Sequence, residues 1–171
     1  SFFAIKNNDT QPTTLTPGPN KTMWFVEWMG NNVGSVTTTG KVTEYPARFA
    51  GFSNSFGIAH GKDGRMWFAD PQHHRIGAIH TNGTGLTFYK LGSASTPDSI
   101  IAGPDGNLYF GEYGSSTAGR IGMITTAGKI TEFNLPAAEG AFPVLGLTVQ
   151  GGNIWFANNT HSKVGMLKLA K

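Results

Sequence analysis

The sequence predicts an all-β protein, a β-propeller of four-stranded blades, and three repeated features carry this prediction. An aromatic strand segment occurs four times, at intervals of about 43 residues. Each segment is followed by a β-branched residue and a glycine. A threonine, one intervening residue and an aromatic residue follow three of these pairs. Four short strands in each repeat are typical of a propeller blade.

The aromatic segments predict the second strand of each blade, and they lie at residues 23–25, 66–68, 108–110 and 154–156. The glycine pairs predict the third strand, and they are Val33-Gly34, Ile76-Gly77, Ile121-Gly122 and Val164-Gly165. The fourth strand is predicted at residues 43–45, 87–89 and 131–133. Asp63-Gly64 and Asp105-Gly106 precede two of the aromatic segments, where a hairpin turn needs residues that tolerate positive φ.

A β-sandwich of regularly spaced hairpins is the alternative fold. A sandwich gives no reason for side-chain identities to recur at a fixed period, so the repeat favours the propeller. The length of 171 residues, 18.2 kDa, suits one domain with a real core. We therefore place a single propeller domain of four repeats at residues 1–171.

The two ends of the sequence predict how the blades close. The last repeat stops near residues 167–169 without a fourth strand, while residues 1–6 align with the fourth strand at 131–136. Pairing residues 1–6 with the last blade would remove an exposed strand edge and complete four blades. Large residues such as Ile58 and Ile100 would crowd a four-bladed channel. An eight-bladed homodimer of two chains joined head to tail is therefore favoured over a four-bladed monomer.

The composition narrows the classes of function. The net charge of +3 is small and scattered, so we expect no nucleic-acid partner. No apolar run approaches the roughly 20 residues that span a bilayer, so we expect no membrane association. The sequence has no cysteine, which excludes disulfides and thiolate metal sites. Low charge with much Gly, Thr and Asn favours an extracellular or periplasmic location over a cytoplasmic one.

Acidic residues follow the second strand in three repeats, as Glu27, Asp70 and Glu112, and Asn158 takes that position in the last. The loops after the second strands meet at one mouth of a propeller, so we expect these side chains to form a ring. Carboxylate oxygens suit Mg²⁺ or Ca²⁺, and neighbouring carboxylates raise one another's pKa. The alternative is that each acid serves its own blade, and repetition in every blade favours this structural role.

Other side chains are expected at the same mouth. The candidate ligand-binding residues are Trp28, Tyr113, Asp98 and Asn158, and the candidate catalytic residues are His73, His161 and Glu112. Neighbours in an extended loop point to opposite sides, so we do not expect His73 and His74 to bind one metal ion.

The third repeat resembles the repeat of the virginiamycin B lyase (streptogramin lyase) family. The similar segments are Gly-Pro-Asp-Gly-Asn-Leu-Tyr-Phe-Gly-Glu at 103–112, Gly-Arg-Ile-Gly at 119–122 and Gly-Lys-Ile-Thr-Glu-Phe at 128–133, and the likeness extends over essentially the whole chain. The resemblance implies seven-bladed enzymes that open the cyclic depsipeptide streptogramin B by elimination. It also implies Mg²⁺ with acidic and histidine residues at one mouth of the ring.

This chain departs from the family pattern in its four repeats, in Asn158, and in the spacing of its histidines. His73, His74 and His161 lie three or four residues beyond the acidic position, whereas the resemblance implies a catalytic histidine close behind it. These departures favour a binding or assembly module for a small molecule, glycan or peptide, since a propeller fold implies no chemistry. The alternative is a Mg²⁺-assisted carbon–oxygen lyase.

Overall fold

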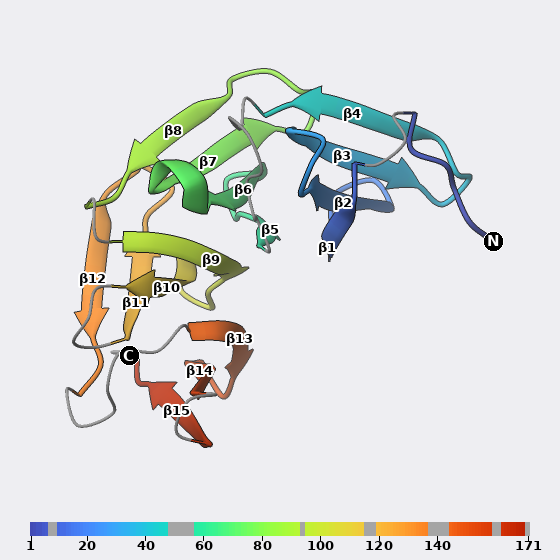
Figure 1. Cartoon of the computed structure of the whole chain (residues 1–171). Coiled ribbons are helices and arrows are strands. Elements are labelled where there is room, and N and C mark those ends of the chain that lie inside the picture. The colour runs from blue at the N-terminus through green and yellow to red at the C-terminus, as the bar shows by residue number, and fades with distance from the viewer. Residues whose placement is uncertain are drawn as a thin grey trace.

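The computed structural model describes residues 1–6, 10–47, 57–92, 95–114, 119–136, 144–158 and 162–169. These residues form four antiparallel sheets, each built from consecutive strands (Figure 1). The chain is therefore an all-β protein of propeller blades, as the sequence predicts. Within the described residues no helix has the length and apolarity to cross a membrane.

The strands of each sheet follow in chain order. The first sheet holds β1 (Pro12–Pro17), β2 (Thr22–Glu27), β3 (Asn32–Thr37) and β4 (Val42–Pro46). The second holds β5 (Ile58–His60), β6 (Arg65–Asp70), β7 (Arg75–His80) and β8 (Thr87–Lys90), with the short 3₁₀ helix η1 (Pro71–His73) after β6. The third holds β9 (Ser95–Ala102), β10 (Leu108–Gly114), β11 (Arg120–Ile124) and β12 (Ile130–Asn134). The last holds β13 (Val144–Gln150), β14 (Asn153–Asn158) and β15 (Lys163–Leu167).

The glycine of each predicted pair lies beneath an aromatic ring of its own sheet. Gly34 pairs with Phe25 across β2 and β3, and a Cβ on Gly34 would stand 2.1 Å from the Phe25 ring. Gly77 stands in the same relation to Phe68, at 2.2 Å. The ring occupies the space that any side chain would need. This explains why the β-branched residue is followed by glycine in every repeat.

The aromatic pairs of the second strands form the core between sheets. Successive side chains of a strand point to opposite faces, so Trp67 packs toward the third sheet while Phe68 packs toward the first. Trp67 also stacks on Tyr89 of β8, with ring centroids 5.4 Å apart. Both Trp67 and Phe68 are completely buried. Each interior sheet is thus held on both faces by one residue pair.

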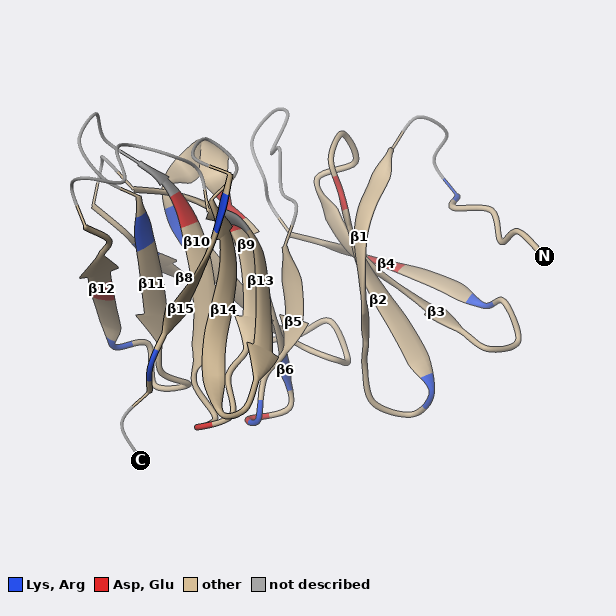
Figure 2. Cartoon of the chain, turned by 90° about the horizontal axis from the view of Figure 1, so that it is seen from below, with Lys and Arg blue, Asp and Glu red and all other residues tan. Residues whose placement is uncertain are grey.

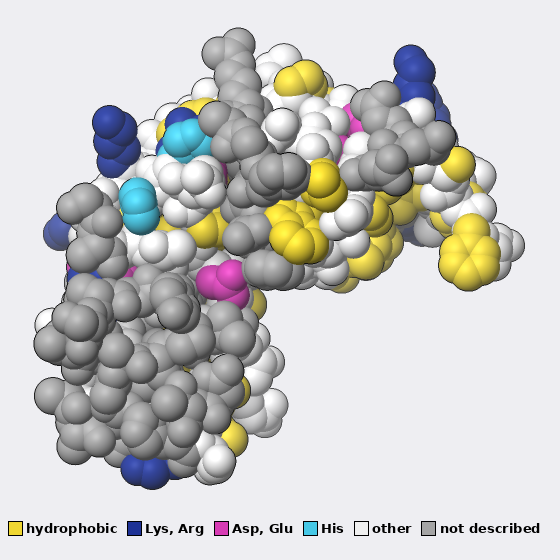
Figure 3. Space-filling model, viewed as in Figure 1, with side chains coloured by type: hydrophobic (Ala, Val, Ile, Leu, Met, Phe, Trp, Pro, Cys, Tyr) yellow, Lys and Arg dark blue, Asp and Glu magenta, His cyan; other side chains and the backbone are white. Residues whose placement is uncertain are grey.

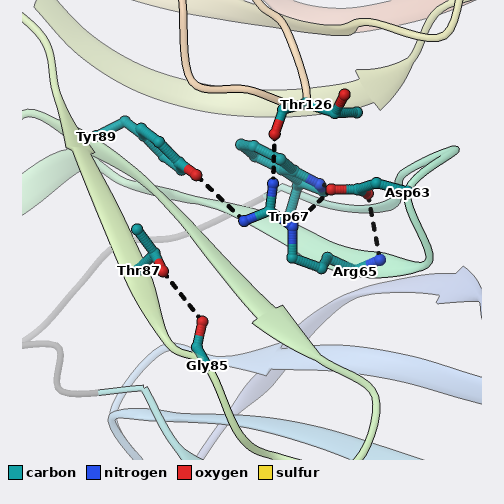
Figure 4. Close-up of polar contacts among 7 residues, drawn as sticks. All are labelled: Asp63, Arg65, Trp67, Gly85, Thr87, Tyr89 and Thr126. Atoms are coloured by element: carbon teal, nitrogen blue, oxygen red, sulfur yellow. Dashed lines mark hydrogen bonds and ion pairs between the residues drawn. The ribbon is translucent and has the colours of Figure 1, made fainter.

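Arg65, the first residue of β6, ties the second sheet to the third. Its guanidinium donates hydrogen bonds to the Tyr89 hydroxyl, at 3.1 Å, and to the carbonyl of Thr126 in the β11–β12 turn, at 2.6 Å (Figure 4). The same group pairs with Asp63 and lies 4.4 Å from the Trp67 ring centre. These contacts of Arg65 lie at the end of the second sheet that carries the β5–β6 turn.

The four sheets fan out as an arc, and their first strands line its inner side (Figure 1). β1 contacts β5, β5 contacts β9, and β9 contacts β13. β10 also comes close to β13: a Cβ on Gly111 would stand 1.8 Å from the carbonyl oxygen of Val144. Seen from below, the N-terminal segment lies beside the first sheet and the C-terminal segment beside the last (Figure 2).

The predicted pairing of residues 1–6 with the last sheet is not found in this structure. The last sheet has three strands among the described residues, and residues 1–6 form none. They lie against the first sheet, where Phe3 and Ile5 line a cavity with Phe25 and Val42. The angles between consecutive sheets leave the first and last sheets at opposite ends of the arc (Figure 1). The segment therefore stays on the sheet nearest to it in sequence.

Candidate functional site

The four positions expected at the mouth are buried within the packing of the blades. Glu27, Asp70 and Glu112 have no exposed surface, and Asn158 is 3% exposed. Each lies two residues beyond the phenylalanine of its second strand, so it shares that ring's face of the sheet. In the second, third and last sheets this face packs against the preceding sheet.

Asp70 is held by two basic side chains of its own sheet. The Arg75 Nε donates to Asp70 Oδ2 at 2.6 Å. The His73 Nδ1 donates to the same carboxylate, at 3.0 Å from both oxygens. The Arg75 guanidinium also lies 3.5 Å from the centre of the Phe88 ring. These contacts fix the end of β6, η1 and the start of β7 as one unit.

Glu112 occupies the same position in the third sheet, beside Arg120. The Arg120 Nε lies 2.9 Å from Glu112 Oε2, and another nitrogen of the guanidinium donates to Glu132 Oε2 at 3.1 Å. Ser95 donates to the other Glu132 oxygen at 3.0 Å. Burial raises the pKa of Glu112 to about 7, and the charge of Glu132 adds to this rise while Arg120 opposes it.

Glu27 faces an amide where the next two sheets place an arginine. Asn32 Nδ2 donates to Glu27 Oε2 at 3.0 Å and reaches Glu44 Oε1 at 3.5 Å. Burial raises the pKa of Glu27 to about 7; the Asn32 hydrogen bond opposes the rise and the charge of Glu44 adds to it. A Cβ on Gly30 would stand 1.9 Å from Glu27 Oε2, so glycine at this position leaves room for the carboxylate.

We did not predict the partners that face these positions, although the sequence signals them. The first residue of each third strand lies opposite the last polar residue of the second strand, as Asn32, Arg75, Arg120 and Lys163. Three of the four are basic, and each directly precedes the β-branched residue and glycine of its repeat. This repeated pairing supports the structural role that repetition favours for the acids.

The other candidates lie in β9, in β10 and directly after β2, or outside the described residues. Asp98 is half-buried in β9, where the pairing register with β10 is interrupted by a bulge between Phe110 and Glu112. Trp28 is half-buried after β2, and its backbone N–H donates to the Gln11 carbonyl. Tyr113 pairs through its backbone with Thr96 of β9. His161 lies outside the described residues.

The adjacent histidines contact different groups. His74 has a left-handed backbone conformation at the end of η1, and its Nδ1 donates to the Ser95 carbonyl at 2.8 Å. This bond joins η1 to the start of β9, whereas His73 turns back to Asp70. Figure 3 shows histidine side chains on the face of the molecule that carries η1.

A shared cation site is not formed by the side chains described. Glu27, Asp70 and Glu112 each contact groups of their own sheet, and the described residues contain no group of three His, Asp or Glu side chains suited to a metal ion. The donor set therefore does not fit a Mg²⁺ or Ca²⁺ ion held jointly by these three acids, and binding of either cation stays a prediction.

The blades and their buried acid positions define a β-propeller protein. A sequence model of the virginiamycin B lyase family matches residues 1–170. The chain belongs to the virginiamycin B lyase family.

Individual relatives agree with this assignment. Virginiamycin B lyase of Nocardia farcinica (strain IFM 10152) is 30% identical over 162 residues, which are 95% of this chain and 53% of that protein. The structure of a catalytically inactive histidine-to-alanine variant of virginiamycin B lyase from Staphylococcus aureus, with quinupristin, is 35% identical with a TM-score of 0.84, and the match covers 96% of this chain and 54% of that one. The selenomethionine form of the Staphylococcus aureus enzyme is 30% identical with a TM-score of 0.82, over 98% of this chain and 58% of that one. The chain thus spans little more than half the length of these relatives.

Proposed function

We propose that this chain is a propeller module that binds a small molecule, glycan or peptide at the face formed by η1 and the start of β9. The environment of the Asp98 carboxylate carries the proposal. Its carboxylate is half-buried, and the described residues give it no hydrogen bond or ion pair, so burial raises its pKa to about 6. A half-buried carboxylate with a raised pKa beside a strand bulge is a candidate for a ligand site.

The neighbouring histidine supplies a second polar group on this face. η1 packs against β9, so His73 and Asp98 belong to contacting elements. A carboxylate accepts, so the His73 Nδ1 donates to Asp70, and in a neutral imidazole the lone pair then lies on Nε2. The His73 side chain is 31% exposed. A ligand at this face would therefore meet one acceptor nitrogen and one carboxylate, neither of which recurs in every blade.

A lyase acting on a cyclic depsipeptide is the second candidate, and the His73–Asp70 pair favours it. A histidine whose Nδ1 is held by a buried carboxylate can accept a proton at Nε2, as a general base does. Removal of a proton beside a carbonyl group would begin the elimination that the family resemblance implies. The match to the family supports this candidate, although the chain spans only about half the length of the relatives.

Calorimetric titration with quinupristin, the compound named with the Staphylococcus aureus relative, tests the site. We expect binding that Asp98→Asn and His73→Ala each weaken at least tenfold, because each removes one of the two polar groups. The matched control is Lys41→Gln, an exposed change on a turn of the first sheet, which should leave the affinity unchanged.

Chromatography of the same samples separates the two candidates. The binding module predicts that the compound is recovered intact. Consumption of the compound that His73→Ala abolishes would establish the lyase instead. Binding that both variants leave unchanged would contradict the proposed site, and no binding at all would contradict this class of ligand.

A further inference from the structure

The turn between β7 and β8 carries an asparagine followed by a glycine, Asn82-Gly83, and no other asparagine of the sequence has this neighbour. Asn82 is exposed, and Gly83 is half-buried with a left-handed backbone, φ 84°. The Gly83 N–H donates to the His80 carbonyl at 2.8 Å and closes a β-turn. Equivalent turns of the first and third sheets hold Thr39-Gly40 and Ala127-Gly128. Among these three turns, only that of the second sheet places a carboxamide before the glycine.

The side chain of Asn82 is held against the backbone that follows it. Its Oδ1 accepts a hydrogen bond from the Thr84 N–H at 3.0 Å and another from the Thr84 hydroxyl at 2.7 Å. A side chain bonded in this way to the backbone two residues on forms an Asx turn. Both donors draw electron density from the carboxamide carbon, as donors to a carbonyl oxygen do in acyl transfer. The turn therefore combines an activated carboxamide with the adjacent backbone nitrogen of Gly83, which no side chain shields.

Two other asparagines with described contacts lack these conditions. Asn107 precedes Leu108, and its Nδ2 donates to Asp105 at 2.7 Å. Asn153 precedes Ile154, and its Oδ1 accepts a backbone N–H at 3.2 Å. The side chain of leucine or isoleucine crowds the backbone nitrogen of its own residue, whereas glycine has no side chain. We therefore expect the carboxamides of both asparagines to react more slowly than that of Asn82.

We propose that Asn82 is a site of spontaneous deamidation, with water as the second reactant. The backbone nitrogen of Gly83 forms a bond to the Asn82 carboxamide carbon, and the bond from that carbon to Nδ2 breaks. Ammonia leaves with the proton that the Gly83 nitrogen gives up. Water then opens the resulting cyclic imide at either carbonyl, which yields an aspartyl or an isoaspartyl residue at position 82. The reaction needs no enzyme or oxidant, and it does not depend on the ligand proposed above.

The modification affects packing because Gly83 lies beneath the Tyr45 ring of β4, where a Cβ on Gly83 would stand 2.3 Å from the ring. Tyr45 also stacks on Trp24 in its own sheet, with ring centroids 5.3 Å apart. An isoaspartyl linkage adds a methylene group to the backbone directly before Gly83 and so moves the glycine relative to the ring. A cavity of about 540 Å³ beside Gly83, lined also by Pro46 and Phe88, leaves room for this movement. We expect the isoaspartyl product to loosen the contact between the first and second sheets, and the aspartyl product to keep it.

Peptide mapping by mass spectrometry, after incubation of the folded protein in mildly alkaline buffer, tests the reaction. We expect the peptide that holds residue 82 to change from amide to acid before any other peptide of the chain. Thr84→Val removes the hydroxyl donor but keeps the N–H, and should slow the reaction about fivefold, the effect of one hydrogen bond. Thr87→Val is the matched control, because the Thr87 hydroxyl donates to the Gly85 carbonyl at 3.1 Å instead (Figure 4), and it should leave the rate unchanged. Earlier modification of a different asparagine, or an equal rate in Thr84→Val, would overturn the proposal.

Hydrogen exchange of fresh and aged protein tests the effect on packing. Asn82→Asp carries the new charge without the added methylene group, and Asn82→Ala cannot react and copies Ala127 of the third sheet. We expect the amides of β4 to exchange roughly fivefold faster, or more, in aged protein than in fresh protein. Fresh Asn82→Asp should exchange like the fresh parent, and Asn82→Ala should not change on ageing. Equal exchange of β4 in aged and fresh protein, or the same acceleration in aged Asn82→Ala, would overturn the predicted loosening.

Discussion

Replacement of Trp67 with alanine is expected to lower the free energy of unfolding by about 3–5 kcal/mol. Trp67 is completely buried between the second and third sheets, where it stacks on Tyr89 and lies beneath the Arg65 guanidinium. Its Nε1 also donates to Asp63 at 3.1 Å, so truncation leaves that carboxylate without this donor. The substitution leaves a cavity between the second and third sheets. This cavity cannot collapse easily, because the strands of both sheets pack around it.

Urea unfolding followed by circular dichroism, at one fixed protein concentration, measures this loss. Trp28→Ala is the matched control, since it removes the same atoms from a half-buried loop position. We expect the control to lose about 1 kcal/mol or less. Equal losses at Trp67 and Trp28 would contradict the assignment of Trp67 to the core between blades.

Replacement of Asp70 with alanine is expected to lower the free energy of unfolding by a similar amount, about 3–5 kcal/mol. The carboxylate is fully buried and is bound by Arg75 and His73, so its removal leaves the Arg75 charge without its counterion inside the packing. The loss follows from the unpaired charge more than from the ion pair itself.

The double variant Asp70→Ala with Arg75→Met isolates that cause. Methionine keeps much of the aliphatic stem that packs on Phe88 but removes the charge. We expect the double variant to lose less stability than Asp70→Ala alone, because no buried charge remains. A double variant that loses the sum of both single changes would show that the two residues act independently, and would contradict their pairing.

The blades follow from the sequence because their defining contacts are local. The aromatic segment, the glycine beneath its ring and the turn residues all lie within one repeat, so their spacing fixes strand order. The sheet against which residues 1–6 pack does not follow from such local contacts. Alignment predicts a fourth strand here, whereas in the structure residues 1–6 form no strand and Phe3 lies against Gly40 of the first sheet. Alignment does not identify which sheet it joins, because that depends on the angles between sheets.

The positions of the acidic residues along the repeats were predicted, but their environment was not. Spacing places Glu27, Asp70 and Glu112 after the aromatic segments, and in the structure Glu27 and Asp70 are the last residues of β2 and β6 while Glu112 lies within β10. Their burial follows from a further step, since two residues along a strand return to the face of the preceding phenylalanine. The basic residues at the start of the third strands complete these positions. Long-range contacts such as that between η1 and β9 leave no comparable pattern in the sequence.

Burial of the two glutamates has a definite consequence for pH dependence. The pKa of Glu27 and that of Glu112 are both raised from the ordinary value of 4.5 to about 7. Below about pH 4.5 both groups are protonated in the folded and unfolded states alike, and their contribution to stability is fully present. As the pH rises through 7 the folded protein must ionise buried carboxyls that the unfolded chain ionised earlier, so this contribution is lost.

The central claim is that Glu27 and Glu112 are buried structural residues, each within its own blade. Carbon-13 NMR titration of the glutamate carboxyl groups, with and without millimolar Mg²⁺, tests this claim most directly. Glu27→Gln and Glu112→Gln assign the two signals. We expect both to titrate with midpoints near 7 and to keep those midpoints when Mg²⁺ is added. Midpoints near 4.5, or a fall of both midpoints on addition of Mg²⁺, would contradict the account and return these residues to a solvent-accessible cation site.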